Sequence, residues 1–233
     1  KGGQYFHPLF MFQVMGINGA FLTGDVFNLF VFFEVLLIAS YALLVHGGGK
    51  QKTQSAVHYV ILNLIGSSLF LFGLGILYGT LGSLNIADMA VRVRELEGAE
   101  AILAKTGGLL LLLVFGLKAA LLPLHFWLPK TYSSASAPVA ALFAIMTKVG
   151  VYSILRVHTL IFGPESGELA DIALPWLWPL SLLTLAIGTI GVLASPSLKL
   201  LTANMVVVSA GTLLIAAALQ SEAATNAALY YIL

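Results

Sequence analysis

The sequence predicts an all-α, polytopic transmembrane helix bundle. Hydrophobic residues make up 59% of the 233 residues and charged residues only 9%, whereas a typical soluble domain has roughly 25% charged residues. Apolar runs of about 20 residues, the length needed to cross a bilayer, recur along the whole chain. A soluble core cannot use this much apolar surface, so lipid must be the main solvent of the chain.

Seven or eight of these runs are long enough to span a membrane, and we assign them to a single transmembrane domain over residues 1–233. Asp25 is placed to cap the second helix, because its carboxylate can accept free backbone N–H groups. The chain begins with Lys and stops inside an apolar run, so we expect a fragment of a longer membrane protein. The expected spans are residues 5–23, 25–45, 55–80, 106–128, 137–161, 174–194 and 198–219, followed by one from 223.

The segment 81–105 interrupts this pattern with a cluster of charged residues. Its apolar residues Ile86, Met89, Val93 and Leu96 are three or four positions apart, which is the spacing of one face of a helix. We therefore expect a short amphipathic helix on the membrane surface. A solvated linker helix explains the same pattern equally well.

The connections between the predicted spans alternate in charge. One set, at residues 46–54, near Lys130 and at 195–199, carries lysines and no acidic residue. The other set, at 81–105 and 162–173, carries both signs of charge. Lys and Arg in short loops favour the cytoplasmic side, so we place the first set in the cytoplasm.

Composition and motifs exclude several classes of function. The net charge of +1 lacks the basic excess of a nucleic-acid-binding protein. The chain has no cysteine, which excludes thiolate metal sites and thiol nucleophiles. No pair of histidines has metal-ligand spacing, and no phosphate-binding, dinucleotide-binding or hydrolase motif occurs. We expect no cofactor, no metal site and no nucleic-acid partner.

Three ionisable residues, Glu34, Lys118 and Lys148, lie in the middle of predicted spans. A charge at this depth costs at least ~2.5–3.5 kcal/mol, so such residues usually face the bundle interior and mark a proton or ion path. One acid and two amines on different helices predict a proton relay. The alternatives are a neutral Glu34 that is hydrogen-bonded between helices and lysines that reach the membrane interface.

A buried Glu–Lys pair can control where a proton resides. Burial alone favours the neutral amine, whereas a carboxylate at ~6 Å attracts the ammonium by ~2.8 kcal/mol at an effective dielectric constant of about 20. Glu34 would thus decide whether Lys118 keeps its proton, and a charged Lys148 would favour release from Lys118. Hydroxyl groups that can hold a water chain nearby are those of Ser133, Ser134, Ser136 and Thr147.

A helix break is predicted close to Lys118. Pro123 removes a backbone hydrogen bond and clashes with the preceding turn, so the helix should break between Lys118 and His125. Transporters place ion sites at such breaks, and His125 is a candidate proton shuttle there. Lys199 is a weaker candidate, because it directly follows a predicted helix start and an anchor at the interface explains it as well.

Three stretches carry a resemblance to a known family: GDVFNLFVFFEVLLIASYALL, FGLKAALLPLHFWLPKTYSSASAPVAALFA and MTKVGVYSILR. They resemble the antiporter-like subunits shared by Mrp-type multi-subunit cation/proton antiporters and respiratory complex I, and the first is most similar to the Mrp-type members. The resemblance implies inverted five-helix repeats, each with a broken helix. It implies that Glu34 and Lys118 match the family's buried pair, that Lys148 matches its central relay residue, and that Pro123 marks the break.

These observations predict a proton-translocating subunit of a multi-subunit Na+/H+ antiporter, which is a secondary transporter and not an enzyme. Its partners would be other membrane subunits, protons and Na+ or another monovalent cation, in the plasma membrane of a prokaryote. One alternative is a proton-pumping membrane subunit of NADH:quinone oxidoreductase or a related membrane hydrogenase. Another is a purely structural bundle, in which changes at Glu34 and Lys118 leave transport intact.

Overall fold

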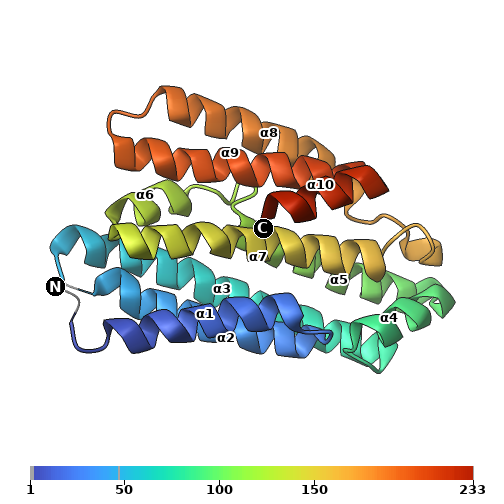
Figure 1. Ribbon diagram of the computed structural model, residues 1–233. Coiled ribbons are helices and arrows are strands. Elements are labelled where there is room, and N and C mark those ends of the chain that lie inside the picture. The colour runs from blue at the N-terminus through green and yellow to red at the C-terminus, as the bar shows by residue number, and fades with distance from the viewer. Residues whose placement is uncertain (1–2, 47, 233) are drawn as a thin grey trace.

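The computed structural model describes residues 3–46 and 48–232, and helices dominate this part of the chain. Figure 1 shows the long helices running along one common axis in three layers. The layers are α1 (Phe6–Leu22), α2 (Val26–Val45) and α3 (Lys50–Leu81), then α5 (Gly98–Ala119), α6 (Trp127–Ser134) and α7 (Ala137–Leu160), then α8 (Leu174–Leu193) and α9 (Leu198–Leu219). A last helix, α10 (Glu222–Ile232), packs against α9.

The helices have the length and surface of a membrane bundle. Six of them in the described chain, α2, α3, α5, α7, α8 and α9, are long and apolar enough to cross a bilayer, and α1 is apolar but shorter. Large hydrophobic side chains such as Met11, Phe72 and Ile190 are exposed on the outer faces. The predicted all-α transmembrane bundle is confirmed.

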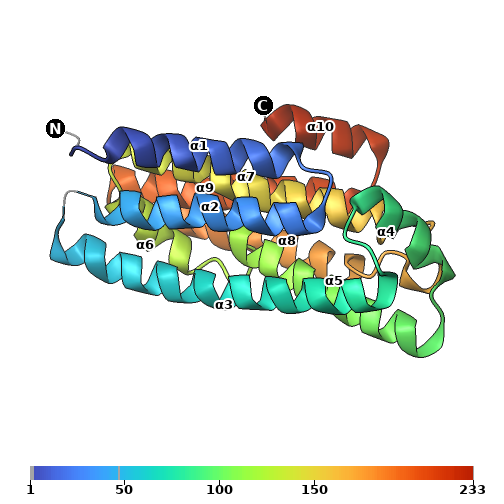
Figure 2. The ribbon, with the colours of Figure 1, turned by 90° about the horizontal axis from the view of Figure 1, so that it is seen from below.

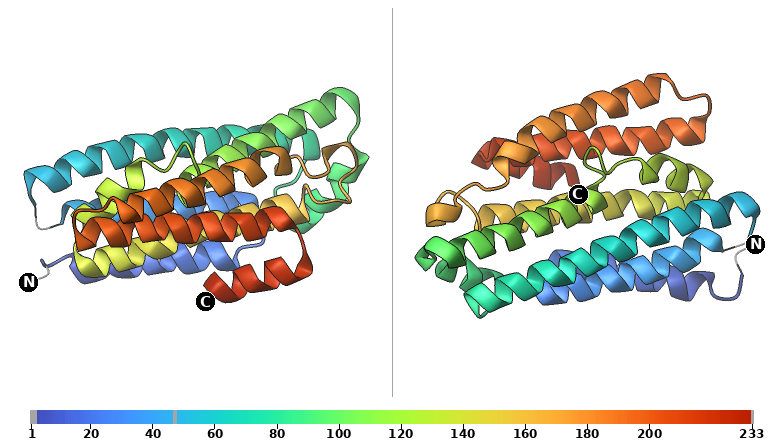
Figure 3. Two further views of the ribbon diagram at one scale, coloured as in Figure 1. Left: turned by 90° about the horizontal axis from the view of Figure 1, so that it is seen from above. Right: turned by 180° about the vertical axis from the view of Figure 1, so that it is seen from behind.

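The view in Figure 2 shows α1, α2 and α3 side by side across one face, with α5 and α7 behind them. α3 packs against both α2 and α5, and Phe33 on α2 also stacks with Phe115 on α5. The same arrangement is visible from behind in Figure 3. α3 therefore contacts both the helix that carries Glu34 and the helix that carries Lys118.

The segment 81–105 contains a short helix, and its location on the membrane surface stays a prediction. α3 ends at Leu81, a short helix α4 covers Ile86–Arg92, and a 3-10 turn follows at Val93–Glu95. Ile86, Met89, Val93 and Leu96 are buried against the protein, whereas Val91 is exposed. α5 already begins at Gly98, because residues 98–105 are rich in helix-forming Ala, Glu, Leu and Lys.

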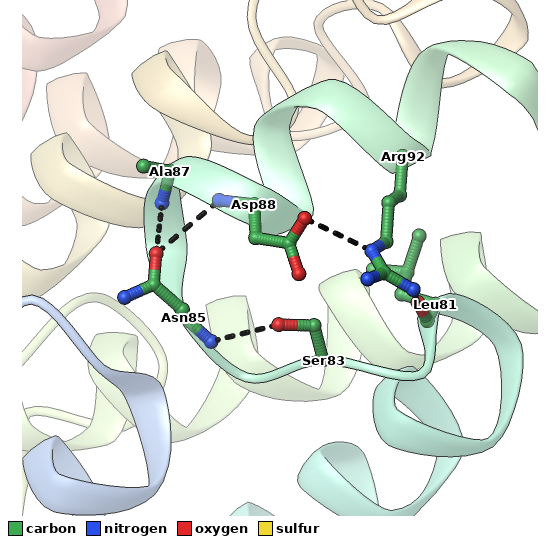
Figure 4. Close-up of polar contacts among 6 residues, drawn as sticks. All are labelled: Leu81, Ser83, Asn85, Ala87, Asp88 and Arg92. Atoms are coloured by element: carbon green, nitrogen blue, oxygen red, sulfur yellow. Dashed lines mark hydrogen bonds and ion pairs between the residues drawn. The ribbon is translucent and has the colours of Figure 1, made fainter.

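Polar contacts fix α4 to the end of the bundle (Figure 4). Asn85 caps α4 by accepting two backbone N–H groups at its start. Asp88 forms an ion pair with Arg92 at 3.0 Å, and Arg92 also donates to the carbonyl oxygen of Leu81 at 3.1 Å. Two backbone hydrogen bonds of 2.9 Å join residues 24–26 to this connection. The α1–α2 and α3–α4 connections are thereby locked together.

The C-terminal ends of α2, α6 and α8 lie at one end of the bundle, and those of α1, α3, α7 and α9 lie at the other (Figure 1). This arrangement separates the basic connections from those that carry both signs of charge. The assignment of the basic end to the cytoplasm stays a prediction.

Candidate functional site

The predicted helix break is present. α5 ends directly after Lys118, at Ala119, and the chain does not resume a helix until α6 begins at Trp127. Ala120 adopts a left-handed conformation with φ of 60°. Pro123 and the half-buried His125 both lie in this interruption.

Side chains from neighbouring elements satisfy the backbone groups that the break exposes. The N–H of Leu122 donates to the Oγ1 atom of Thr184 on α8 at 2.8 Å. The carbonyl oxygen of Leu117 accepts a hydrogen bond of 3.2 Å from the Nε1 atom of Trp127. Non-helical backbone within a membrane protein must find such partners, because lipid offers none. The break is therefore a hydrogen-bonded structure within the protein.

Lys118 is held inside the bundle. Its side chain is only 5% exposed, and its Nζ atom donates to the Oδ1 atom of Asn63 on α3 at 2.7 Å. Asn63 is itself buried, and its Nδ2 atom donates to the carbonyl oxygen of Tyr59 at 2.7 Å. The ring of Phe33 lies 5.9 Å from Nζ. These contacts direct the ammonium into the protein and away from the membrane interface.

Glu34 is half-buried on α2 and accepts a hydrogen bond from the hydroxyl of Ser67 on α3. Ion pairs within 4 Å occur in the described residues between Asp88 and Arg92 and between Arg94 and Glu165, and no third pair joins Glu34 to Lys118. Glu34 and Lys118 are thus brought to the same intervening helix, where each has its own partner.

Lys148 reaches the level of Lys118 through close contact between α7 and α5. A Cβ atom at Gly150 would lie 2.6 Å from the backbone nitrogen of Ala119 and 2.9 Å from the carbonyl carbon of Lys118. Only glycine permits this approach. Lys148 lies two residues earlier and is half-buried, and its Nζ atom has no hydrogen-bond partner among residues 3–46 and 48–232.

Three of the four hydroxyl groups expected to hold a water chain are bonded locally. Ser133, Ser134 and Thr147 each donate to a backbone carbonyl three residues earlier in the chain. A hydroxyl bonded in this way keeps its lone pairs available as acceptors. Their part in a proton path stays a prediction.

The remaining predicted residues lie in different settings. Asp25 accepts the backbone N–H of Asn28 at 2.9 Å, which is a capping contact at the start of α2. The Nδ1 atom of His125 is buried and has no hydrogen-bond partner within the described chain. Lys199 is exposed on the first turn of α9 and lines a groove of about 330 Å³ between α7 and α9. Pro123 is exposed.

Sequence reasoning missed the polar residues of α3 and the glycine on α7. Asn63 and Ser67 interrupt the apolar run YVILNLIGSSLFLF. A polar residue in the middle of a spanning helix is a signal in its own right, because it needs a partner in the bundle. Gly150 carries no such signal, because glycine is common in membrane helices.

No group of three or more His, Asp or Glu residues is close enough to hold a metal ion in the part of the chain that the structure describes. The polar groups that meet on α3 are the Glu34 carboxylate with the Ser67 hydroxyl and the Lys118 amine with the Asn63 amide. Such a set can hold and pass protons.

Comparison with known proteins places this site in a family. Residues 23–233 match the family model described as NADH:quinone oxidoreductase/Mrp antiporter, TM. The chain belongs to this family of multi-pass membrane proteins. It is 46% identical over 230 residues to the D-type subunit of a probable K+/H+ antiporter of Rhizobium meliloti, covering 99% of this chain and 43% of that protein.

Two further relatives agree with this placement. The D-type subunit of a Na+/H+ antiporter of Alkalihalophilus pseudofirmus is 41% identical over 231 residues, covering 98% of this chain and 45% of that protein. The solved Mrp complex from Dietzia contains a chain that aligns with a TM-score of 0.85 at 30% identity, covering 98% of this chain and 42% of its own length. The chain thus spans less than half the length of these relatives.

Proposed function

We propose that the chain is part of a proton-translocating subunit of a multi-subunit monovalent cation/proton antiporter. It acts as a component of a secondary transporter, and not as an enzyme, in the plasma membrane of a prokaryote. The observation that carries the proposal is a fully enclosed lysine amine, Lys118, at the end of a spanning helix that breaks inside the bundle. The two curated relatives are named for K+/H+ and Na+/H+ exchange, so the coupled ion is Na+ or K+.

In this proposal Lys118 holds the transported proton at mid-membrane. Glu34 on α2 favours the charged amine when it approaches, and its withdrawal favours release. Lys148 receives the proton on α7, where the contact at Gly150 holds the two helices together. Moving one charge against 100 mV requires ~2.3 kcal/mol, which is comparable to the ~2.8 kcal/mol attraction of an ion pair at ~6 Å and an effective dielectric constant of about 20. The free-energy change on opening or closing one Glu–Lys pair is therefore comparable to that of moving one proton against the membrane potential.

The proposed partners are other membrane subunits of the same complex. The exposed apolar faces of the bundle provide surfaces for lipid and for neighbouring subunits. His125 and Lys199 stay secondary candidates, since His125 lies in the break and Lys199 lies at the basic end of the bundle.

The test is cation-driven proton movement in inverted membrane vesicles that carry the full complex. Lys118→Ala and Glu34→Gln should abolish or strongly reduce the pH change that follows addition of NaCl or KCl. Lys105→Ala is the matched control, because Lys105 lies on the same helix and is exposed. Wild-type transport by Lys118→Ala, at equal amounts of assembled complex, would overturn the proposal.

A second candidate is a proton-pumping membrane subunit of an NADH:quinone oxidoreductase. The matching family model covers both kinds of complex by its description. Purification of the complex distinguishes them, because a redox enzyme would carry flavin or iron–sulfur absorbance and an antiporter would not. The two relatives named as antiporter subunits favour the antiporter.

A further inference from the structure

Asn63 and Ser67 lie one helical turn apart on α3, between the two ionisable residues of the predicted pair. The ammonium of Lys118 donates to Asn63 from the α5 side at 2.7 Å. The carboxylate of Glu34 accepts from Ser67 on the α2 side. Each charged group is therefore bonded to a neutral group of α3 in place of the other charged group.

Gly66 lies on the same face of α3, between these two polar residues. A Cβ atom at this position would lie 3.9 Å from the Nζ atom of Lys118 and 2.9 Å from the Cδ2 atom of Leu117. The Leu117 side chain therefore packs directly against the backbone of Gly66, next to the Lys118 ammonium. α3 thus places no side chain of its own between Asn63 and Ser67 on this face.

We propose that α3 holds the Glu34–Lys118 pair open through Asn63 and Ser67, and that the pair closes across Gly66. Asn63 and Ser67 are positioning residues in this proposal, which rests on the proposed function. A neutral amide stabilises the charged amine less than a carboxylate does. The open arrangement thus favours release of the proton, and the closed arrangement retains it.

Among the titratable groups on the elements packed around Lys118, one is suited to control whether the amine keeps its proton. The titratable groups on α2, α3, α6 and α7 and in the break are Glu34, Tyr41, Lys50, Lys52, His58, Tyr59, Tyr78, His125, Lys130, Tyr132, Lys148, Tyr152, Arg156 and His158. The Tyr59 hydroxyl is bonded to Ser40, and the Tyr132 hydroxyl donates to the carbonyl of Phe143. Glu34 is the single carboxylate of the set.

The test is the pH dependence of cation-driven transport by the full complex in inverted vesicles, with NaCl and KCl in separate runs. Asn63→Ala and Ser67→Ala each remove one bond that competes with the direct pair. Closure of the pair then retains the proton on Lys118, so the rise of transport with pH should move upward by about one pH unit, equivalent to a tenfold change in the proton equilibrium.

Two variants separate this role from simple packing. Ser67→Thr retains a hydroxyl and should restore the wild-type pH profile. Ser68→Ala, at the exposed neighbouring serine whose hydroxyl donates to the Leu64 carbonyl, should leave the profile unchanged. If Asn63→Ala does not assemble, the pH profile of Ser67→Ala, a change at a half-buried position, tests the inference alone.

An unshifted profile for assembled Ser67→Ala, or equal shifts for Ser67→Ala and Ser68→Ala, overturns the inference. That result differs from failure of the proposed function, in which Lys118→Ala itself transports normally. If Lys118→Ala abolishes transport but the pH profile of Ser67→Ala is unshifted, the proposed function stands. In that case α3 does not control the Glu34–Lys118 pair.

Discussion

The two sides of the middle layer treat their lysines differently. On the α3 side, Lys118 is enclosed and bonded to Asn63 at 2.7 Å. On the α9 side, Lys148 has no hydrogen-bond partner within the described residues, and Lys199 is exposed beside a groove lined mainly by small side chains. The difference teaches that a lysine in an apolar run does not define its own environment. The polar groups on the neighbouring helix define it.

A buried amine with a fixed neutral partner is pre-organised for proton exchange, whereas an amine without a partner depends on water or on groups outside the described residues. The α3 side would therefore control the proton, and the α9 side would receive it. Substitutions at the contacts between the two sides, and at the lysines themselves, test this difference.

The largest effect is expected for Gly150→Ala, which acts at the contact between α5 and α7. The added Cβ atom would overlap the backbone at Ala119, 2.6 Å away, and backbone cannot move aside as a flexible side chain does. We expect a loss of stability of about 3 kcal/mol, seen as a lower melting temperature of the purified complex. Gly75→Ala is the control, because no atom lies within 4 Å of its Cβ position. Equal melting temperatures for the two variants would contradict the close contact.

A somewhat smaller effect is expected for Thr184→Val, which acts on the break. The variant keeps the volume of the side chain but removes the acceptor of the Leu122 N–H. An unsatisfied buried N–H costs about 1–3 kcal/mol, so the melting temperature of the complex should fall. Thr189→Val, at an exposed threonine of the same helix whose hydroxyl donates to its own helix backbone, should melt like the wild type. An equal decrease in the melting temperature for Thr189→Val would show that the hydrogen bond to Leu122 does not add to the stability of the complex.

The third effect compares the two lysines of the α9 side. Lys148→Ala should lower cation-driven proton movement at least tenfold, or about 1.4 kcal/mol in the barrier, because it removes the acceptor at the level of Lys118. Lys199→Ala should retain most of the activity, because Lys199 is exposed on the first turn of α9. Transport assays on equal amounts of complex measure both. If Lys199→Ala lost more activity than Lys148→Ala, the relay would pass through Lys199 and the groove beside it and not through Lys148.

The smallest effect is expected for Asp88→Asn, far from both sides. The Arg92 guanidinium holds the pKa of the Asp88 carboxyl below its usual range. A lowered folded-state pKa means that the ion pair stabilises α4 at neutral pH and stops doing so as the pH falls through that value. The group is exposed, so the melting temperature at pH 7 should fall by less than about 1 °C. The account would be contradicted if Asp88→Asn lowered the melting temperature more than the control Glu97→Gln does, and if this difference persisted at pH 3.

Much of the fold could be predicted from the sequence, because lipid imposes strong constraints. Long apolar runs must become helices, Pro123 must interrupt one of them, and charged residues in mid-span must turn inward. The helix bounds within 81–105 could not be predicted, because a charged stretch fits equally a surface helix and the polar start of a longer helix. Only burial of Ile86 and Met89 against the core distinguishes them.

The direct partner of Lys118 could not be predicted in the same way. Apolar residues occupy every face of α3, so hydrophobic periodicity does not show which face turns toward α5. The rotation of α3 is set by close packing at positions such as Gly66 and Gly73, where neighbouring side chains approach within van der Waals distance. Pairing of Glu34 with Lys118 was predicted from charge alone, whereas the intervening amide and hydroxyl emerge only from packing.

The most direct test of the central claim is transport by Lys118→Arg in the full complex. Arginine keeps a positive charge and hydrogen-bond donors beside Asn63 but does not lose its proton at any physiological pH. If Lys118 takes up and releases the transported proton, the assembled variant should show no cation-driven pH change in inverted vesicles. Wild-type transport by an equal amount of the Lys118→Arg complex would show that the amine serves only as a fixed charge.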